Sequence, residues 1–565
     1  MKNFYILIVL FFIGCDSKST TEGNPDIPPI TVIDKTPNTP ISIDTPIANN
    51  EDPLLDYQWH LNSTQTTLTN YASSVFHNLS SITRVQDILY ATLSGRNNFD
   101  FAFAKVGVDL KKDETTYTGK GVTVAVIDNG IELNHPDLAV DESLSFEYRG
   151  RITDPSPTEN QLDSGAVAAT HGTCCAGIIA ALGNNGIGVR GVAPDTILVG
   201  LNAFSSGTTA AFISAMLHKN ELIDIYSNSW GDSPGGITQG EIEALIESAT
   251  HGRNGKGSIF VFAGGNDRSS GVNANYFQEL NSKHVITVAA IKADGNVANY
   301  SNPGANLLVS TFGGGEDGKS DPAIVTTDLT GLAFGYDNEK THFDVEGNEN
   351  GDYTYSMNGT SAACPMTAGV IALMLEANAD LSLRDIRYIL ATTASQLDPF
   401  DTTTQLNGGQ HLFSHDTGFG SINVDAAVSA SETFIPLGTE LVSVYYPPST
   451  QELIIKAGET QSSEISLPFD YKVEFVDINV SLFHSDLADI EITLTSPSGM
   501  VAVLSDINSA FNSAYRDIFE DFRFGASCFL DEQSIGRWRL TVKNTSRFSD
   551  ATLQQWKIRI NGRTL

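Results

Sequence analysis

Cysteine is scarce in this chain, which has five cysteines in 565 residues, an odd number. Two of them, Cys174 and Cys175, are neighbours, and nothing in the spacing shows which thiols could pair. So low a count excludes the disulfide framework that stabilises small secreted domains. A chain of this length must instead bury apolar cores of its own, and we expect two or three folded units.

Cationic residues are scarce as well, with 33 Lys and Arg against 67 Asp and Glu and a formal net charge of −34. Binding to phosphate backbones needs clustered Lys and Arg, so the composition excludes nucleic acid as a partner, and an anionic membrane surface as a target. The acidic balance suits a secreted protein that must stay soluble, and it offers carboxylates to Ca²⁺. We expect a monomer.

Long apolar runs are missing after the first residues, so we expect no later segment to span a membrane. The run from Tyr5 to Ile13 follows the cationic Lys2 and is too short to cross a bilayer, which is typical of an export signal. It ends in FIGC, Phe12 to Cys15, which resembles a bacterial lipobox, where the cysteine receives diacylglycerol.

We therefore expect residues 1–15 to be a lipoprotein signal peptide. Cys15 would then anchor the exported chain in a bacterial membrane, either the outer membrane, on its periplasmic face, or the cell surface. The alternative is an ordinary signal peptide with an incidental cysteine.

Composition divides the rest of the chain into three segments. Residues 16–51 are rich in Pro, Thr and Asn and indicate a tether. Residues 52–435 alternate short β-branched runs with helical patterns, which predicts an α/β domain with a parallel sheet and helices on both faces. Residues 440–565 show period-two alternation, which predicts an antiparallel β-sandwich.

The apolar runs and helices of the α/β region can be placed individually. Five runs are expected to be strands buried on both faces: Val122–Ile127, Thr196–Leu201, Ile223–Ser227, Ser258–Ala263 and His284–Ala290. Helices are expected at Gly172–Leu182 and at Leu383–Ala391. The second of these is opened by Ser382, with Asp385 three residues on.

Three polar residues stand where such elements meet. Asp128 follows the first strand, at the end where open α/β sheets place their ligands. His171 lies in HGTCCAGIIAAL, at the expected start of a helix of small residues. Ser361 lies in NGTSAACPM, which leads into an apolar helix with Pro365 in its first turn, so its hydroxyl and N–H lie at a positive helix end. Each alone is more simply a loop, structural or capping residue.

Taken together, these residues resemble a known family. The order Asp, His, Ser, in the contexts DNG, HGT and GTSxAxP, is similar to the subtilisin-like serine peptidases, and within them to the kexin/furin branch. Branch-specific matches include DPLLDYQWHL (52–61), IYSNSWG (225–231), GSIFVFAGGN (257–266) and SHDTGFGSINVDAAV (414–428). The carboxy-terminal region resembles the branch's P domain in DLADIEITLTSPSG and GRWRLTV.

This resemblance implies a serine endopeptidase that acts on proteins or peptides, with Asp128, His171 and Ser361 as its catalytic triad. It also implies Asn266 as the side-chain donor of an oxyanion hole, with the Ser361 N–H as the second donor. The positions that correspond to substrate binding are Ser229, Trp230, Gly231 and Asn275. Cys175 matches a free cysteine one helical turn from His171, and we expect a packed thiol without a catalytic role.

Calcium is a further implication of the resemblance. The residues that match a strong calcium site are Asp52, Asp137 and Asn185 through their side chains, with carbonyls near Leu182, Ile187 and Val189. A set of oxygen ligands from several loops suits Ca²⁺. The alternative is that these are turn residues.

The sequence departs from the branch where acidic residues are expected. Only Asp232 remains of the acidic run after SWG, and Asn129, Asn275 and Asn302 stand at positions of acids. Each change removes negative charge that would attract a basic side chain. We therefore expect strict cleavage after dibasic sites to be lost or relaxed.

Maturation is expected to differ too. The catalytic domain begins near Asp52, so we expect no large prosegment to be removed, and residues 62–117 are expected to form an insertion or lid. The alternative function is a catalytically idle subtilisin scaffold used for surface binding or adhesion. The four intact residues Asp128, His171, Ser361 and Asn266 weigh against it.

Overall fold

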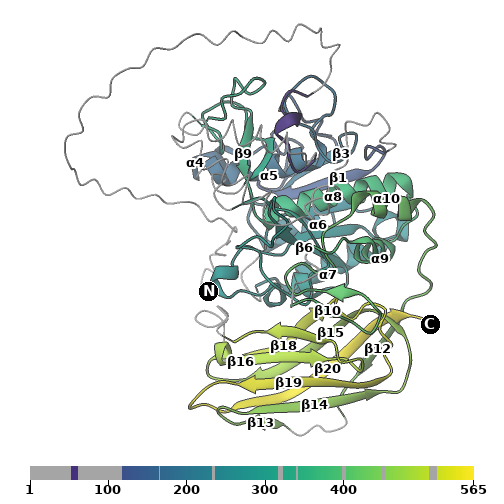
Figure 1. Ribbon diagram of the computed structural model, residues 1–565. Helices are drawn as coiled ribbons and strands as arrows, with labels where there is room; N and C mark the ends of the chain where they lie inside the picture. Colours follow the sequence, from purple (N-terminus) through teal and green to yellow (C-terminus); the bar gives the residue numbers. More distant parts are fainter. Residues whose placement is uncertain are drawn as a thin grey trace, which may run out of the picture.

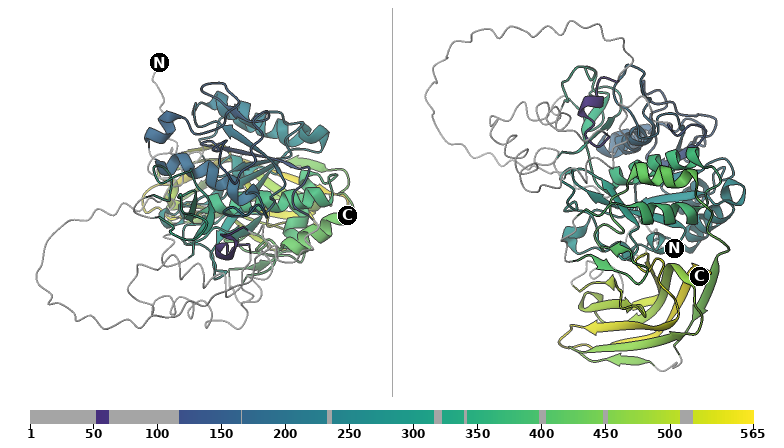
Figure 2. Two further views of the ribbon diagram at one scale, coloured as in Figure 1. Left: turned by 90° about the horizontal axis from the view of Figure 1, so that it is seen from above. Right: turned by 45° about the vertical axis from the view of Figure 1, so that its right-hand side comes forward.

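The computed structural model describes residues 52–61, 117–164, 166–231, 236–315, 322–338, 342–397, 403–447, 452–507 and 518–565. Within these ranges an α/β unit is followed by a β-sandwich, which lies on one side of it (Figures 1 and 2). The tether, Cys15, Asp232 and nearly all of segment 62–117 lie outside the described residues.

A seven-stranded parallel sheet forms the centre of the α/β unit, in the order β2-β3-β1-β4-β5-β6-β7. The strands are β1 (Thr123–Asp128), β2 (Phe146–Glu147), β3 (Ile197–Asn202), β4 (Ile225–Asn228), β5 (Ile259–Ala263), β6 (Val285–Ile291) and β7 (Val309–Phe312). Every residue of β1 and of β4 to β7 is buried. Burial on both faces confirms the predicted parallel sheet.

Helices cover this sheet. They are α4 (Glu159–Ser164), α5 (Ala166–Ala180), α6 (Thr209–Met216), α7 (Gln239–Gly255), α8 (Thr360–Ala377), α9 (Leu383–Thr393) and α10 (Val424–Glu432). Helix α8 lies against β4 to β7 and also contacts α5, whereas α6 and α7 pack on each other. The capping box expected for α9 is present, because Ser382 and Asp385 each accept from the other's backbone N–H.

The short elements complete the α/β unit. Two antiparallel pairs join β8 (Ile324–Thr327) to β9 (Tyr353–Met357) and β10 (Gln405–Leu406) to β11 (Leu412–Phe413). The 3₁₀ turns are η1 (Leu55–Tyr57), η2 (Arg268–Ser270), η3 (Ala274–Tyr276), η4 (Glu279–Asn281) and, in the sandwich, η5 (Leu487–Asp489).

One long apolar helix, α8, lies in the core of the α/β unit. It is the one helix within the described residues that is long and apolar enough to span a bilayer, with 18 residues and a mean hydropathy of 1.3. It passes that test because it is a core helix, with 89% of its length buried inside the fold. Its side chains are mostly small, which lets it pack closely on the sheet.

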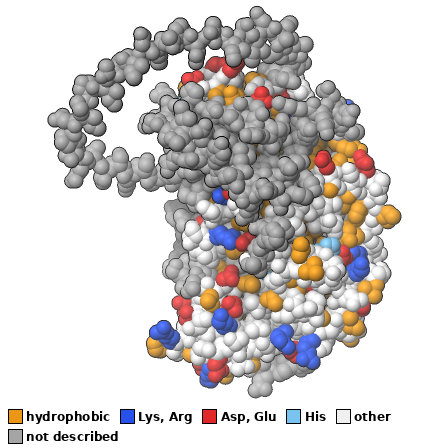
Figure 3. Space-filling model, viewed as in Figure 1, with side chains coloured by type: hydrophobic (Ala, Val, Ile, Leu, Met, Phe, Trp, Pro, Cys, Tyr) orange, Lys and Arg blue, Asp and Glu red, His pale blue; other side chains and the backbone are white. Residues whose placement is uncertain are grey.

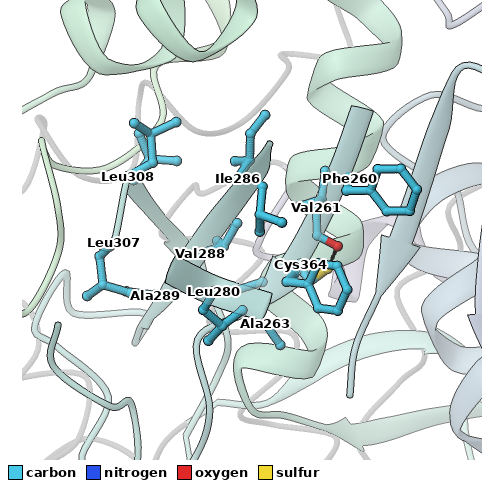
Figure 4. Close-up of a cluster of buried hydrophobic side chains, with 14 of the residues drawn as sticks. Phe260, Val261, Ala263, Leu280, Ile286, Val288, Ala289, Leu307, Leu308 and Cys364 are labelled. Atoms are coloured by element: carbon cyan, nitrogen blue, oxygen red, sulfur yellow. Dashed lines mark hydrogen bonds between the residues drawn. The ribbon is translucent and has the colours of Figure 1, made fainter. Parts of the chain in front are cut away.

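The core beneath α8 fixes where its first turn lies. Figure 4 shows side chains of β5 and β6, such as Phe260, Ile286 and Val288, with Cys364 of α8 beside them. The Cys364 sulfur lies 3.4 Å from the Val261 carbonyl oxygen. This contact holds the start of α8, and with it Ser361, next to the carboxyl end of β5.

Two antiparallel sheets form the sandwich, in the orders β12-β20-β15-β18, with β13 also pairing with β20, and β14-β19-β16-β17. Their strands are β12 (Leu441–Tyr445), β13 (Leu453–Ile455), β14 (Thr460–Leu467), β15 (Lys472–Phe483), β16 (Ile490–Thr495), β17 (Val501–Ser505), β18 (Ile518–Ala526), β19 (Gly536–Asn544) and β20 (Ala551–Arg563). Alternate residues of β16 and β19 are buried. The predicted period-two strands are therefore confirmed.

Both signs of charge occur on the face of the molecule seen in Figure 3. There, Lys and Arg side chains of the described residues lie singly or in small groups beside Asp and Glu. That mixture differs from the continuous basic stripe of a nucleic-acid-binding face.

Candidate active site

Asp128 is the last residue of β1, and its side chain is 1% exposed. The Asn129 N–H donates to Asp128 Oδ1 at 2.7 Å. The strand end is held in turn by Trp230, whose Nε1–H donates to the Ile127 carbonyl at 2.8 Å. The carboxylate is thus fixed at the carboxyl edge of the sheet, where ligands of open α/β sheets bind.

His171 lies within α5 and faces Asp128. Its Nδ1 is 2.9 Å from both carboxylate oxygens of Asp128. Helix α5 begins at Ala166, so His171 lies in its second turn rather than at its start as predicted. A hydrogen bond from Nδ1–H to the carboxylate places the basic lone pair of the neutral ring on Nε2, which is the tautomer that a general base needs.

The pKa of His171 is set by two opposing effects. Burial by itself would lower it, but the Asp128 carboxylate, with a contribution from Cys175, outweighs burial and raises the pKa of the imidazole above its ordinary value. The imidazolium that forms when His171 takes a proton is therefore stabilised by Asp128.

Ser361 is the second residue of α8, after Gly359, which adopts a φ of 97° that favours glycine, and Thr360. Its Oγ donates to the Ser229 carbonyl at 3.2 Å, while Ser229 Oγ donates to the Ser361 carbonyl at 2.9 Å. Pro365 is the sixth residue of α8, so it lies in the second turn and not in the first as predicted. The Ser361 N–H is one of the free donors of the first turn.

Asn266 follows β5 and is held by Thr360. The Thr360 N–H and Oγ1–H both donate to Asn266 Oδ1, at 2.9 and 2.8 Å, and Thr360 Oγ1 accepts from the Gly265 N–H at 3.0 Å. Because Oδ1 accepts from Thr360, Nδ2 is the donor end of the amide, and it lies beside Gly359. This arrangement can supply one hydrogen bond to a developing oxyanion.

Asn302 supports the loop after β5 that carries Asn266, a role that the sequence did not predict. Its Nδ2 donates to the Gly264 carbonyl at 3.2 Å, its Oδ1 accepts from the Asp267 N–H at 2.8 Å, and its own N–H donates to the Gly265 carbonyl at 3.0 Å. It therefore clamps the backbone on both sides of Asn266. The one sign of this role in the sequence was that Asn302 stands at a position where an acid was expected.

The predicted substrate-binding residues after β4 differ in whether backbone or side chain lies at the edge of the sheet. Ser229, Trp230 and Gly231 follow β4 beside Ser361, with their backbone at the carboxyl edge of the sheet. The Trp230 ring is 6% exposed and packs against Phe204, Phe212 and Phe262, so its side chain belongs to the core.

Asn275, which we predict to lie in the substrate-binding region, is fully buried and holds internal hydrogen bonds. Its Nδ2 donates to Asn281 Oδ1 and to the Gly525 carbonyl, at 2.8 and 2.7 Å, and its Oδ1 accepts from the Ala305 N–H at 2.8 Å. Gly525 belongs to β18, so Asn275 connects the α/β domain to the sandwich.

Cys175 contacts the His171 ring and the backbone of Ser361. Its sulfur is 3.9 Å from His171 Nδ1 and 3.6 Å from the Ser361 carbonyl oxygen. The nearest ligand atoms of Asp128, His171 and Cys175 lie within 4.8 Å of one another, so a soft metal such as a mercurial could bind there and displace His171. Cys174, Cys175, Cys364 and Cys528 are free and buried.

The residues predicted to bind calcium come from three segments, which meet at the loop after α5. Asp52 accepts from the N–H groups of Asn184 and Asn185 at 2.8 and 2.9 Å. Asp137 accepts from Asn185 Nδ2 at 2.8 Å and from the Val189 N–H at 3.0 Å. The same loop includes Leu182, whose N–H donates to the Asp137 carbonyl, and Ile187, whose N–H donates to Asn185 Oδ1.

The chemistry of this donor set fits a divalent cation. Burial raises the pKa of Asp137 to about 8, with a further contribution from the neighbouring Asp52, and burial also raises the pKa of Asp52. Two adjacent buried carboxylates are unfavourable as anions unless a positive charge compensates them. Arg190 lies near Asp52 and lowers its pKa in part.

A parallel α/β sheet with His171 on Asp128 at its carboxyl edge, and with Cys175 between His171 and the Ser361 carbonyl, has the architecture of the subtilisin-like serine peptidases. Comparison with family models agrees. The Subtilase family model matches residues 119–420, and the Proprotein convertase P-domain model matches residues 473–560. The chain therefore belongs to the subtilase family and carries a P domain.

Individual relatives place the chain near furin. It is 33% identical to Furin-1 of Xenopus laevis over 469 residues, which cover 80% of this chain and 55% of that protein. It is 31% identical to proprotein convertase subtilisin/kexin type 7 of Homo sapiens over 466 residues, which cover 80% and 56%. The chain thus spans about half the length of these curated relatives.

One solved structure is similar to this chain over nearly the whole length of both proteins. The serine protease of Aeromonas sobria is 25% identical, with a TM-score of 0.75, and the match covers 91% of this chain and 96% of that one.

Proposed function

We propose that this protein is an exported serine endopeptidase that hydrolyses peptide bonds in proteins through an acyl-enzyme. The observation that carries the proposal is the contact of His171 Nδ1 with both oxygens of Asp128, at 2.9 Å, beside Ser361 in the first turn of α8. Cys175 contacts both His171 and Ser361, which supports their proximity.

In the mechanism, Ser361 Oγ attacks the peptide carbonyl while its proton passes to His171 Nε2. The hydroxyl must first leave the Ser229 carbonyl, and catalytic hydrogen bonds often tighten only once substrate is bound. Asp128 holds the imidazole and stabilises the imidazolium, which then protonates the leaving amine. Water repeats the sequence on the acyl-enzyme and releases the second product.

The tetrahedral intermediate carries a negative oxygen, which the Asn266 amide and the Ser361 N–H would stabilise. Donors of this kind act most strongly when they are fixed before the reaction. Thr360 and Asn302 supply that fixation, because they hold the Asn266 side chain and its backbone respectively.

Ca²⁺ is the cofactor that we propose for Asp52 and Asp137, with Asn185 and the carbonyls of Leu182, Ile187 and Val189 as further ligands. Bound there, it would neutralise two buried carboxylates and tie the residues before η1 to the loop after α5. Its contribution is structural rather than chemical.

For the substrate, we propose that strict cleavage after dibasic sites is lost or relaxed. Asn275 and Asn302 are buried and use both amide atoms in internal hydrogen bonds, and Asn129 Nδ2 donates to the Ala168 carbonyl at 3.0 Å. Amides that hold the backbone cannot attract a Lys or Arg side chain as carboxylates do. Substrates with apolar or neutral P1 residues should therefore compete with dibasic ones. A peptide library showing a sharp Lys-Arg preference would contradict this proposal.

Location is proposed from the sequence. The chain would be exported and held by lipid on Cys15 in a bacterial membrane, with the Pro- and Thr-rich segment as spacer. Mass spectrometry of the mature amino terminus tests this, since a diacylglyceryl group on Cys15 supports it and an unmodified Cys15 contradicts it.

The test of the function is labelling with a fluorophosphonate of a soluble form that starts near residue 50, with Ca²⁺ and with EDTA. Labelling that Ser361→Ala abolishes and that EDTA weakens supports the proposal. No labelling of the folded protein would favour the alternative, an idle scaffold for surface binding or adhesion.

A further inference from the structure

A cavity of about 240 Å³ lies where the catalytic domain meets the sandwich. Its walls come from α9, from the residues around the start of β6, and from β15 and β20. Figure 1 shows α9 on the side of the catalytic domain that faces the sandwich. The proposed catalytic residues are not among the residues that line it.

The lining is cationic, although the chain as a whole has a net charge of −34. Its charged members are Lys256, Lys283, Arg384 and Arg387, against Glu440 and Glu474. Three of the cations already have a carboxylate partner. The pairs are Lys283 with Glu440 at 2.6 Å, Arg384 with Glu474 at 2.6 Å, and Lys256 with the exposed Asp380 at 2.8 Å.

Arg387, the fourth cation, has a different environment. It is 8% exposed, donates to the Val285 carbonyl and to Ser527 Oγ, and lies 5.3 Å from the centroid of the Phe475 ring. Among the described residues, those two oxygens are its hydrogen-bond acceptors, and no carboxylate lies within ion-pair distance. Buried guanidinium groups are almost always paired with an anion.

The positive potential of the cavity affects a neighbouring histidine. Burial, together with the nearby Lys283, Arg523 and Arg387, lowers the pKa of His284 to about 3. Burial also lowers the pKa of Arg387 to about 10, and Glu474 compensates for this only in part. Both shifts come mainly from burial, and cationic neighbours add to the shift of His284.

We propose that this cavity binds a small oxyanion, such as sulfate or hydrogen phosphate, through the Arg387 guanidinium with Lys283 and Arg384 around it. A guanidinium presents parallel N–H donors that match two oxygens of such an anion. The volume is many times the roughly 10–15 Å³ that one water requires, so an anion and several waters fit. A bound anion stabilises the contact of α9 with β15 and so the docking of the sandwich.

The test is calorimetric titration of the full-length Ser361→Ala protein, in Ca²⁺, with sodium sulfate at constant ionic strength. One sulfate should bind per chain, and the unfolding temperature should rise by about 3 °C and then saturate, as ligand linkage requires. A rise that stays linear in sulfate, with no heat of binding, reflects the general exclusion of sulfate from protein surfaces and overturns the proposal.

Variants locate the site. Arg387→Met should weaken sulfate binding at least tenfold, and Arg387→Lys, which keeps the charge but loses the parallel donors, should have an intermediate effect. The control is Arg539→Met, because Arg539 is an exposed arginine of β19 that pairs with Glu464. Sulfate affinity that is unchanged in folded Arg387→Met, or reduced equally in Arg539→Met, contradicts the assignment. If Arg387→Met does not fold, the titration of the parent protein still decides whether sulfate binds.

Discussion

At the scale of single residues, the candidate catalytic side chains owe their positions to neighbours that do no chemistry. Thr360 holds the Asn266 amide, Asn302 clamps the backbone on either side of it, and Trp230 fixes the end of β1 before Asp128. Each holds its target by hydrogen bonds within the core, where a lost partner leaves a buried polar group unpaired.

Asn266→Ala tests the oxyanion hole directly. We expect kcat to fall roughly 10²–10³-fold with little change in KM, because the amide stabilises the transition state more than bound substrate. Steady-state kinetics on a peptide ester and an amide measure this. An effect confined to KM would instead place Asn266 in substrate binding.

Thr360→Val tests the support of that amide. The hydroxyl accepts from the Gly265 N–H and donates to Asn266, so its loss should lower kcat about tenfold, the effect of one misplaced hydrogen bond. Thr367→Val is the matched control, since Thr367 lies on the same helix and its hydroxyl donates only to the Ala363 carbonyl. Equal losses in both variants would indicate damage to α8 rather than to the oxyanion hole.

The pH dependence of activity follows from His171. The base must be neutral to accept the serine proton, so kcat/KM should rise with pH, and the raised pKa of His171 places the midpoint above its ordinary value of 6.5. Asp128→Asn removes the carboxylate that raises this pKa, so residual activity should titrate at lower pH and be roughly 10⁴-fold weaker. A midpoint that does not move would show that Asp128 does not set the pKa of the base.

At the scale of elements, the segment around η1 and the loop after α5 depend on one another through Asp52 and Asp137. In EDTA, stability should fall as pH rises from about 4 to about 8. Over that range the folded state keeps the proton of Asp137, whose pKa is about 8, while the unfolded state has released it.

Ca²⁺ should reverse this trend, because it binds the ionised carboxylates and its affinity increases as Asp137 loses its proton. Unfolding temperatures measured from pH 5 to pH 8, with Ca²⁺ and with EDTA, test the prediction. Asp137→Asn should remove both the pH trend and most of the gain from Ca²⁺. Stabilisation by Ca²⁺ that persists in this variant would place the ion elsewhere.

At the scale of the whole molecule, the sandwich completes the fold of the catalytic domain. Strand β18 reaches into the loop beside the sheet, where the Gly525 carbonyl accepts from Asn275 and the Gly525 N–H donates to Asn281. A side chain at Gly525 would meet the backbone of Asn281 and the ring of Phe475. Docking therefore requires close approach of the two domains.

Removal of everything after residue 435 should take away the partners that Gly525 supplies to Asn275 and Asn281. We expect the shortened protein to unfold at least 10 °C lower or to be recovered mainly as aggregate, which differential scanning calorimetry and gel filtration would show. Gly525→Val in the full chain should give a smaller loss in the same direction. A shortened protein as stable as the parent would mean that the sandwich acts on substrate and not on the fold.

Much of this molecule follows from local sequence. The β-branched runs that became β1, β3, β4, β5 and β6 were located to within two residues, because a buried parallel strand needs a continuous apolar segment. The order of Asp128, His171 and Ser361 led us to expect that their side chains would meet at one edge of the sheet. The structure shows the contact of Asp128 with His171, and the role of Ser361 stays a prediction.

Tertiary structure alone decided which polar residues remain available for function. Asn275 and Asn302 stand where acids of a substrate pocket or metal site were expected, yet their amides are used by Gly525, 250 residues away, and by the loop that holds Asn266. Arg387 faces a cavity that exists only because two domains meet. Periodicity reports the face on which a side chain lies, whereas hydrogen bonding and charge compensation depend on partners that only the folded chain brings within reach.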